Sequence, residues 1–325
     1  MNRHRVFDLK QQGGIDTCRT GVPDDIFIVC ASYEPRTMAS AECLAADYFA
    51  EKAFIYYNGE FLKGHSQPTV QSKISQLTEL LKGKCSKVAT IEGSWLDARL
   101  QFTAVRSALE AEITDMPEVA ITIDTTTFNR ESLLITLALL RSLHRQTRIR
   151  ILYVSPADHG EWLSRGFRCV RNIMGFPGTQ QPSLPTLLAV LSGFEPERVL
   201  KLVDEHEPTI IYMGIGDPPT EPRFLERNIE EQKLILARQD VEEFRFSAEN
   251  VMDCRDQLEE LLTPHIGSYN IILAPMSTKL STVATLLVAE RHTEIQLTYC
   301  VPGEYNIDSY SRGADTLFME EISGG

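Results

Sequence analysis

The sequence lacks the features that mark secreted, membrane-spanning and disulfide-bonded proteins. It has no run of about 18 apolar residues, so it predicts no transmembrane helix. Its first residues contain no apolar signal-peptide core. No Cys-x-x-Cys pair occurs, and an odd number of cysteines on apolar stretches indicates buried thiols in a reducing compartment. We therefore expect a cytoplasmic protein with no membrane partner. The cysteines are Cys18, Cys30, Cys43, Cys85, Cys169, Cys254 and Cys300.

Short catalytic and cofactor motifs are also missing. The sequence has no His-x-His or His-Glu-x-x-His pair, no Gly-x-Ser-x-Gly and no Gly-x-x-x-x-Gly-Lys-Ser/Thr. It therefore predicts no metal site, no serine-hydrolase elbow, no P-loop and no bound cofactor. The scattered histidines are His4, His65, His144, His159, His206, His265 and His292.

Acidic residues outnumber basic ones. The chain has 45 Asp and Glu against 32 Lys and Arg, which gives a net charge of −13. Proteins that bind long nucleic acids gain affinity by neutralising phosphates with Lys and Arg, so we expect no such partner. A small anionic ligand is compatible with this charge, because a few local donors suffice to hold it.

Length and hydrophobic pattern predict an α/β protein with two halves. At roughly 150 residues per domain, a chain of 325 residues has room for two. Short apolar runs alternate with helical stretches, which predicts doubly wound, mostly parallel, Rossmann-like sheets. In the first half, strands are expected at 26–31, 53–57, 87–91, 119–123 and 148–154, and helices near 38–49, 69–82, 97–112 and 132–143.

The same alternation restarts after a stretch rich in Gly and Pro. We expect a flexible arm at residues 1–23, a first domain at 24–175, a linker at 176–185 and a second domain at 186–325. The tail from residue 311 would be an edge element or frayed. In the second half, strands are expected at 186–191, 209–213, 244–246, 270–273 and 295–301, and helices near 195–205, 224–238, 251–262 and 280–289.

Three pairs of similar segments, in the same order in both halves, indicate an internal duplication. The first pair follows a buried strand and contains an aromatic residue, Glu and Pro; the second links a strand to an apolar helix; the third ends a strand. The alternative is that Ser, Thr and Pro commonly follow the strands of any doubly wound domain, so that the matches need no duplication. The pairs are residues 32–36 with 192–198, 123–129 with 273–279, and 153–156 with 299–302.

The second pair of segments suggests anion sites. Ligands of open parallel sheets bind beyond the carboxyl ends of the strands, where helix N-termini favour negative charge. In the second half, the hydroxyls of Ser277 and Thr278 would donate to a phosphate and Lys279 would add a point charge. The alternative is a helix N-cap beside a solvated lysine.

The first half carries a different set of side chains at the equivalent place. They are Asp124, Thr126, Thr127 and Asn129. Asp124 would accept from a ribose hydroxyl or a base amine, or act as a general base if the protein is an enzyme. The alternative is that these residues cap the following helix.

Glutamate and arginine recur after the first strand of each half. Glu34 with Arg36, and Glu195 with Arg198, would form phosphate clamps in which Glu orients the guanidinium. The alternative is an ion pair within each domain beside a proline in the first helical turn.

A further glycine-rich segment lies at residues 213–219. Gly214 would permit close approach of a ligand, and Asp217 would meet a ribose or serve as a base in an enzyme. The third glycine of a dinucleotide fingerprint is missing, so a tight turn is the alternative.

Residues 274–281, with the sequence APMSTKLS after a strand and before an apolar helix, resemble the Gly-Gly-Thr-Lys helix start of CARF domains. These domains are Rossmann-like sensors of cyclic oligoadenylates in prokaryotic antiviral defence, and two fused CARF-like halves are similar to the SAVED arrangement. The resemblance implies ligand contacts from Ser277, Thr278 and Lys279, and from Ser32 and Ser192 after the first strands. It also implies homodimerisation.

This chain departs from the family pattern. Ala, Pro and Met replace the glycines at 274–276, and Phe128 and Asn129 stand where Thr and Lys would in the first half. The two halves account for nearly all of the chain, so an effector would be a separate protein.

Three functions remain open at this point. The first is a nucleotide sensor that acts on a separate effector in antiviral defence. The second is an enzyme that hydrolyses a glycosidic or phosphodiester bond of a nucleotide in the same cleft, with Asp124 or Asp217 as base. The third is a scaffold subunit without catalysis.

Overall fold

The chain divides into two α/β units. The computed structural model describes residues 4–9, 23–113, 116–143 and 147–323. Unit 1 consists of Met1–Gly160 and Ile307–Gly325, and unit 2 of Glu161–Asn306. These units correct the expected boundaries at residues 175 and 186: the chain enters unit 2 earlier than expected and returns to unit 1 at its end.

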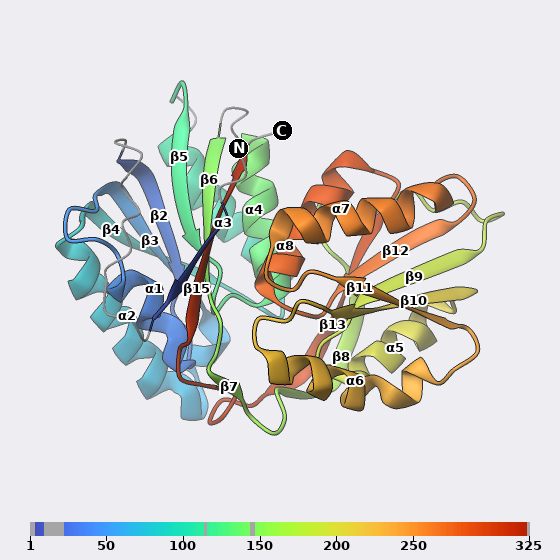
Figure 1. Ribbon diagram of the computed structural model, residues 1–325. Coiled ribbons are helices and arrows are strands. Elements are labelled where there is room, and N and C mark those ends of the chain that lie inside the picture. Colours follow the sequence, from blue (N-terminus) through green and yellow to red (C-terminus); the bar gives the residue numbers. More distant parts are fainter. Residues whose placement is uncertain (1–3, 10–22, 114–115, 144–146, 324–325) are drawn as a thin grey trace. The chain divides into compact units, whose positions relative to one another are not determined.

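Unit 1 is built on a seven-stranded sheet (Figure 1). Five strands are parallel, and in the three central ones the apolar residues are buried on both faces, as expected for strands covered by helices on both sides. Strand β15 pairs antiparallel with β6, and β1 pairs antiparallel with β15. The order is β1(Arg5–Asp8), β15(Thr316–Ser323), β6(Thr147–Val154), β5(Val119–Asp124), β2(Asp24–Cys30), β3(Ala50–Asn58), β4(Cys85–Gly93).

Helices α1 and α2 of unit 1 contact each other, as do α3 and α4. Phe27 and Val29 of β2 join Leu77 and Leu81 of α2 in one buried apolar cluster. The helical elements are η1(Pro35–Met38), α1(Ala39–Glu42), η2(Gly59–Leu62), η3(Gly64–Ser66), α2(Gln67–Lys82), α3(Ala98–Ile113) and α4(Arg130–Leu143).

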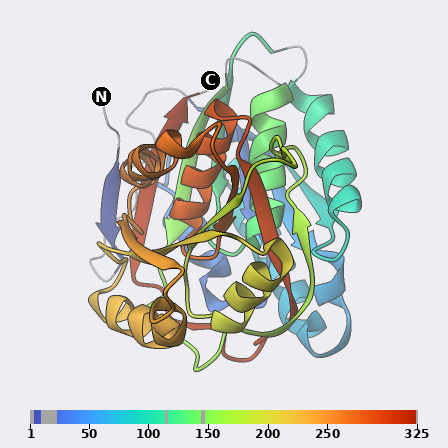
Figure 2. The same ribbon diagram turned by 90° about the vertical axis from the view of Figure 1, so that its right-hand side faces the viewer.

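Unit 2 has a six-stranded sheet in which five strands are parallel and β8 pairs antiparallel with β13. Figure 1 shows α7 and α8 above the strands and α5 and α6 below them, and Figure 2 shows the same separation. The order is β11(Val241–Phe246), β10(Ile210–Gly216), β9(Thr186–Leu191), β12(Asn270–Pro275), β13(Gln296–Tyr305), β8(Ser164–Asn172). The helical elements are α5(Pro196–His206), α6(Pro222–Leu236), α7(Val251–Leu262), η4(Thr263–His265) and α8(Lys279–Arg291).

The two sheets have the same topology. Reading from β4 to β6 in unit 1 and from β11 to β13 in unit 2, the parallel strands occur in the chain order third, second, first, fourth, fifth. An antiparallel strand then follows in each, β15 in unit 1 and β8 in unit 2. The chain therefore has two Rossmann-like halves, and strand order reverses between β2 and β5 and between β9 and β12.

Three expectations about local structure need correction. The helix expected at 38–49 ends at Glu42, because the Lys84 ammonium donates to the carbonyls of Leu44 and Ala45 at 3.1 and 2.7 Å and so satisfies groups that a longer helix would use. Residues 316–323 of the tail are neither an edge nor frayed, since they form β15, which lies between β6 and β1. Cys169, expected to be buried, is exposed on the outer strand β8.

Part of the expected N-terminal arm is ordered, because Arg5–Asp8 forms β1 against β15. The rest of that arm falls mostly on residues 1–3 and 10–22, which lie outside the described residues, as do Cys18 and His144. Within the described part of the chain, no helix is both long and apolar enough to span a bilayer.

Candidate ligand-binding edges of the two sheets

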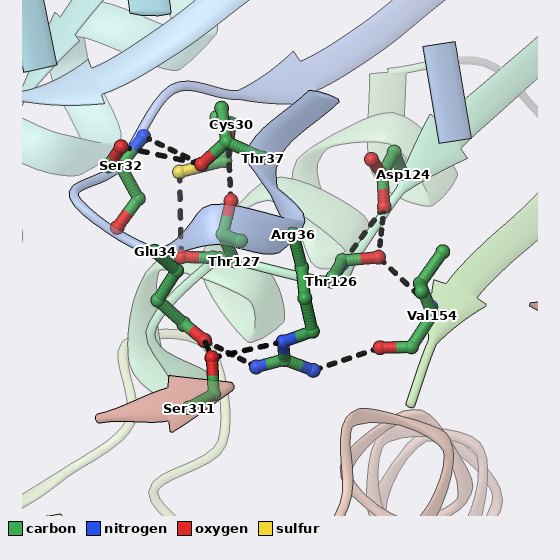
Figure 3. A network of polar contacts seen from close by, with 10 residues as sticks. All are labelled: Cys30, Ser32, Glu34, Arg36, Thr37, Asp124, Thr126, Thr127, Val154 and Ser311. Carbon is green, nitrogen blue, oxygen red and sulfur yellow. Dashed lines mark hydrogen bonds and ion pairs between the residues drawn. The ribbon is translucent and has the colours of Figure 1, made fainter. Parts of the chain in front are cut away.

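In unit 1, the loops after β2 and β5 meet where strand order reverses. Thr127 Oγ1 donates to the Cys30 carbonyl at 2.6 Å, and Cys30 Sγ lies 3.5 Å from the Thr127 carbonyl (Figure 3). Ser32 is buried just beyond, and its backbone N–H donates to Thr37 Oγ1 at 3.3 Å. The structure thus brings together Ser32, Thr126 and Thr127, which the sequence placed on separate strand ends.

Asp124 organises the loop after β5. Its Oδ1 accepts from the backbone N–H of Thr126 at 2.9 Å and from the Thr126 hydroxyl, and its Oδ2 accepts from the Ser40 hydroxyl. Burial raises the pKa of Asp124, and these hydrogen bonds oppose the shift. Asp124 is 1% exposed and its bonds stay within unit 1, so it holds the loop after β5 in shape, whereas the following helix is capped by Asn129 and not by Asp124.

Glu34 and Arg36 form a buried ion pair next to this loop (Figure 3). Arg36 Nη2 donates to Glu34, Nη1 to the Val154 carbonyl at 2.7 Å, and Nε to Ser311 Oγ at 3.3 Å. Ser311 Oγ in turn donates to Glu34 Oε2 at 2.7 Å. Burial acts to lower the pKa of Arg36, but Glu34 outweighs it and the pKa is raised, so the guanidinium stays charged. All three guanidinium nitrogens therefore have partners inside the unit.

Unit 2 repeats this pair. Arg198 Nη1 donates to Glu195 at 2.8 Å, and Nε donates to the Cys300 carbonyl at 2.9 Å. The Ser164 hydroxyl donates to the other oxygen of Glu195. Arg36 and Arg198 are each 2% exposed. In both units the arrangement matches the ion-pair alternative, in which the pair braces the loop after the first strand against the end of the fifth.

The loops after β9 and β12 are in close contact in unit 2. The backbone N–H of Met276 donates to the Leu191 carbonyl at 2.9 Å. A Cβ on Gly193 would collide with the Met276 carbonyl, so only glycine permits this approach. The Gly193 carbonyl accepts from the side-chain amides of Asn228 and Gln232 at 2.7 and 2.8 Å.

Each of these edges leads into the N-terminus of a long helix. Thr278 caps α8: its Oγ1 accepts from the Ser281 N–H at 3.2 Å and donates to the Ala248 carbonyl at 2.8 Å. Asn129 does the same for α4, where its Oδ1 accepts from the Ser132 N–H at 2.7 Å. The first residue of α8 is Lys279, and the first residue of α4 is Arg130.

Arg130 was missed by the sequence comparison, which aligned Lys279 with Asn129. The structure shows that the caps, Asn129 and Thr278, correspond, so the basic residue follows one position later in the first half. Arg130 and Lys279 are each 8% exposed. Ser277 and Thr278 are partly exposed beside Lys279.

Other predicted residues lie away from these loops or inside strands. Gly214 is within β10, where a Cβ would collide with the Phe244 ring, and its carbonyl accepts from Ser192 Oγ at 2.7 Å. Asp217 follows β10 and its side chain is about half exposed. Its Oδ2 lies 3.8 Å from Arg245 Nη1. Close strand packing therefore accounts for the glycine.

Ser40, Ser164 and Ser311 carry no motif that would single them out in the sequence, because each meets its partner only through the fold. Among the residues that the structure describes, no three His, Cys, Asp or Glu side chains are grouped so that they could hold a metal ion.

No family model matches the chain, and no curated protein matches it in sequence. Its structure is similar to that of a Type III CRISPR defence DNA nuclease activated by cyclic oligoadenylate, with a TM-score of 0.52 and 9% identity over 90% of this chain and 68% of the nuclease. The cytoplasmic domain of a prokaryotic cation chloride cotransporter is more distant, with a TM-score of 0.28 and 8% identity over 88% of this chain and 99% of that domain. The first likeness supports the Rossmann-like fold; the second is too weak to carry an argument.

Proposed function

We propose that this protein is a tandem CARF-like sensor of a nucleotide signal in prokaryotic antiviral defence. The ligand's phosphates bind at the carboxyl edges of the sheets, beside the N-termini of α4 and α8. The observation that carries the proposal is the repeated pair of a helix cap and a basic first residue, Asn129 with Arg130 and Thr278 with Lys279, each at the strand-order reversal of its sheet.

The chemistry of these helix starts favours an anion. The first N–H groups of a helix and its dipole attract negative charge, and a basic side chain at the first position adds to that attraction. Unit 2 also offers the partly exposed Ser277 and Thr278. In this proposal the buried pairs Glu34–Arg36 and Glu195–Arg198 shape the loops and do not touch the phosphates.

The biological setting is inferred from the likeness to the nuclease that cyclic oligoadenylate activates and from the CARF-like segment at 274–281. We propose that the sensor acts on an effector that lies outside the two Rossmann-like units. The Asp124 carboxylate already accepts hydrogen bonds from Thr126 and Ser40. This favours a binding role for its loop over a catalytic one.

Binding of defined nucleotides to the purified full-length chain tests the proposal. The probes are cyclic oligoadenylates of several ring sizes, with linear oligoadenylate, ATP and cyclic AMP for comparison. A ligand that binds the folded state raises the melting temperature, and calorimetry gives its affinity. We expect Lys279→Gln and Arg130→Gln to weaken binding by about 10- to 100-fold, the effect of losing a charge-assisted hydrogen bond.

Lys233→Gln is the matched control, because Lys233 is an exposed lysine on α6 that pairs with Glu230. It should leave nucleotide affinity unchanged. The proposal is overturned if none of the probes stabilises the wild-type chain, or if Lys279→Gln and Arg130→Gln bind as tightly as Lys233→Gln.

A further inference from the structure

The two halves exchange their last strands. After β6, the chain does not fold back to pair with it; the next long strand, β8, pairs with β13 in the sheet of unit 2. After β13, the next long strand, β15, pairs with β6 in the sheet of unit 1. The antiparallel strand of each sheet is thus supplied by the other half of the sequence.

Each exchanged segment delivers a serine to the loop after the first strand of the unit it enters. Ser311, just ahead of β15, bridges Glu34 and Arg36 with contacts of 2.7 and 3.3 Å (Figure 3). Ser164, the first residue of β8, donates to Glu195. The equivalent glutamates therefore receive equivalent serines, although these lie in different halves of the chain.

Two short segments, called crossing segments below, carry the chain from one unit to the other, and each ends at one of the two serines. Residues 160–163 connect β7(Asp158–His159) to Ser164, and residues 306–310 connect Tyr305 to Ser311. The segments end in strand ladders at both sides. In unit 1, Ser311 of β14(Ser311–Arg312) pairs with His159, and in unit 2 Tyr305 pairs with Ser164.

Backbone hydrogen bonds hold these crossings within each unit. In unit 1 the Gly160 N–H donates to the Tyr310 carbonyl at 3.2 Å. In unit 2 the Asn306 N–H donates to the Leu163 carbonyl at 2.9 Å, and the Asn306 side chain donates to the Trp162 carbonyl at 2.8 Å. The backbone that leads to each serine is therefore hydrogen-bonded within its own unit.

We infer that Ser311 and Ser164 are positioning residues that couple the two candidate sites. Each serine fixes the Glu–Arg pair that braces one loop, and the crossing segments transmit a shift of that loop to its counterpart. Ligand binding at one sheet edge then changes the affinity of the other. This last consequence rests on the proposed function, whereas the mechanical link exists without ligand.

Hydrogen exchange of the ligand-free, full-length chain, followed by mass spectrometry, tests the link. Ser311→Ala removes a hydrogen bond to a charged group, and we expect exchange to quicken about tenfold in residues 32–38 of unit 1 and also in residues 192–199 of unit 2. Ser164→Ala should quicken exchange in the same two segments. Effects confined to the unit that contains the substituted serine would overturn the coupling.

Ser309→Ala is the matched control. Ser309 lies in the same crossing segment, and its Oγ accepts a 3.4 Å contact from the exposed Arg312 side chain. This substitution should leave exchange at residues 32–38 and 192–199 unchanged. If it quickens exchange there as much as Ser311→Ala does, the serine–glutamate contact is not the coupling element and the inference fails.

A second measurement separates this inference from the sensor proposal. The response of unit 2 to cyclic oligoadenylate is followed by hydrogen exchange in the wild type, in Ser311→Ala and in a chain whose unit 1 site carries Arg130→Gln. With coupling, both substitutions in unit 1 weaken the protection of residues 192–199. If nucleotides protect the wild type but neither substitution alters unit 2, coupling fails and the sensor remains. If no nucleotide binds while the ligand-free exchange effects cross between units, the sensor fails and coupling remains.

Discussion

The Arg36 guanidinium donates to the Val154 carbonyl at 2.7 Å. Arg198 makes the same bond to Cys300, the residue that the internal repeat aligns with Val154. The contact ties the loop after the first strand to the end of the fifth, so its recurrence shows that the duplicated segments kept their architecture. Its buried charges make it costly to break.

Removing the arginine should destabilise the fold strongly. Arg36→Met leaves Glu34 buried without its cation, and we expect a loss of about 3–5 kcal/mol in the free energy of unfolding. The double variant Glu34→Gln/Arg36→Met should be less destabilised than the single one, because it leaves no unpaired charge. Urea denaturation measures both.

Arg106→Met is the control for this prediction, since Arg106 lies exposed on α3 and pairs with Glu110. Loss of such an exposed pair should leave the free energy of unfolding nearly unchanged. An Arg36→Met variant as stable as Arg106→Met would contradict a bracing role for the buried pair.

Thr278 allows helix capping to be separated from anion binding. Thr278→Ala should lower stability by about 1 kcal/mol through loss of the cap. Thr278→Asp retains a capping oxygen but adds a negative charge at the helix start, so it should keep most of the stability and lose the response to cyclic oligoadenylate. Thr278→Ser should keep both. Thermal denaturation with and without nucleotide gives the two readouts, and a full nucleotide response in Thr278→Asp would argue against an anion at this position.

His206 predicts a pH dependence of stability. Burial lowers the pKa of His206, which Glu205 partly opposes, and its Nε2 lies 3.1 Å from Thr298 Oγ1. The unfolded chain therefore takes up this proton near pH ~6.5, before the folded chain does. This contribution to stability should be fully present above that pH and decline as the pH falls below it.

Replacing this histidine should flatten the profile. We expect His206→Gln to lose less stability than the wild type between pH ~7.5 and ~5, measured by urea denaturation. His65→Gln is the control, because the His65 side chain is 80% exposed. If the His206→Gln and wild-type profiles run parallel, His206 does not titrate differently in the two states.

Most parallel strands could be predicted from the sequence because each is a short apolar run between polar turns. The strand expected at 186–191 is β9, and the one expected at 119–123 is β5 with one more residue. The helix near 38–49 was overpredicted, since its spacing does not reveal that the Lys84 side chain takes over two carbonyls.

The strand exchange could not be predicted from the sequence. Residues 164–172 alternate little in burial and carry three arginines, so they show no strong strand pattern. Which parallel strand they join depends on contacts across more than a hundred residues, as between Ser164 and Tyr305. The serine partners of the two glutamates were missed because Ser311 lies 277 residues from Glu34 and Ser164 lies on this unpredicted strand.

The sequence predicted which residues follow the strand ends, and their role in binding stays a prediction. Parallel strands end at one edge of a sheet, so Thr126 and Thr127 were expected at the edge of the first sheet and Thr278 and Lys279 at that of the second. From the sequence, the Glu–Arg pairs could equally clamp a phosphate or brace a loop within the domain. Only their burial in the structure separates these two roles. Ungapped comparison of the halves placed Asn129 opposite Lys279 and so missed Arg130.

The two exchanged strands differ in what lies beyond them. β1 covers the outer side of β15, whereas no described strand follows β8. The unpaired backbone groups of an open strand edge can pair with a strand of another chain, which leads to aggregation. The β8 edge carries Arg165, Arg168 and Arg171 and no carboxylate. Two copies meeting edge to edge would bring these like charges together, so electrostatic repulsion would oppose backbone pairing between copies at this edge.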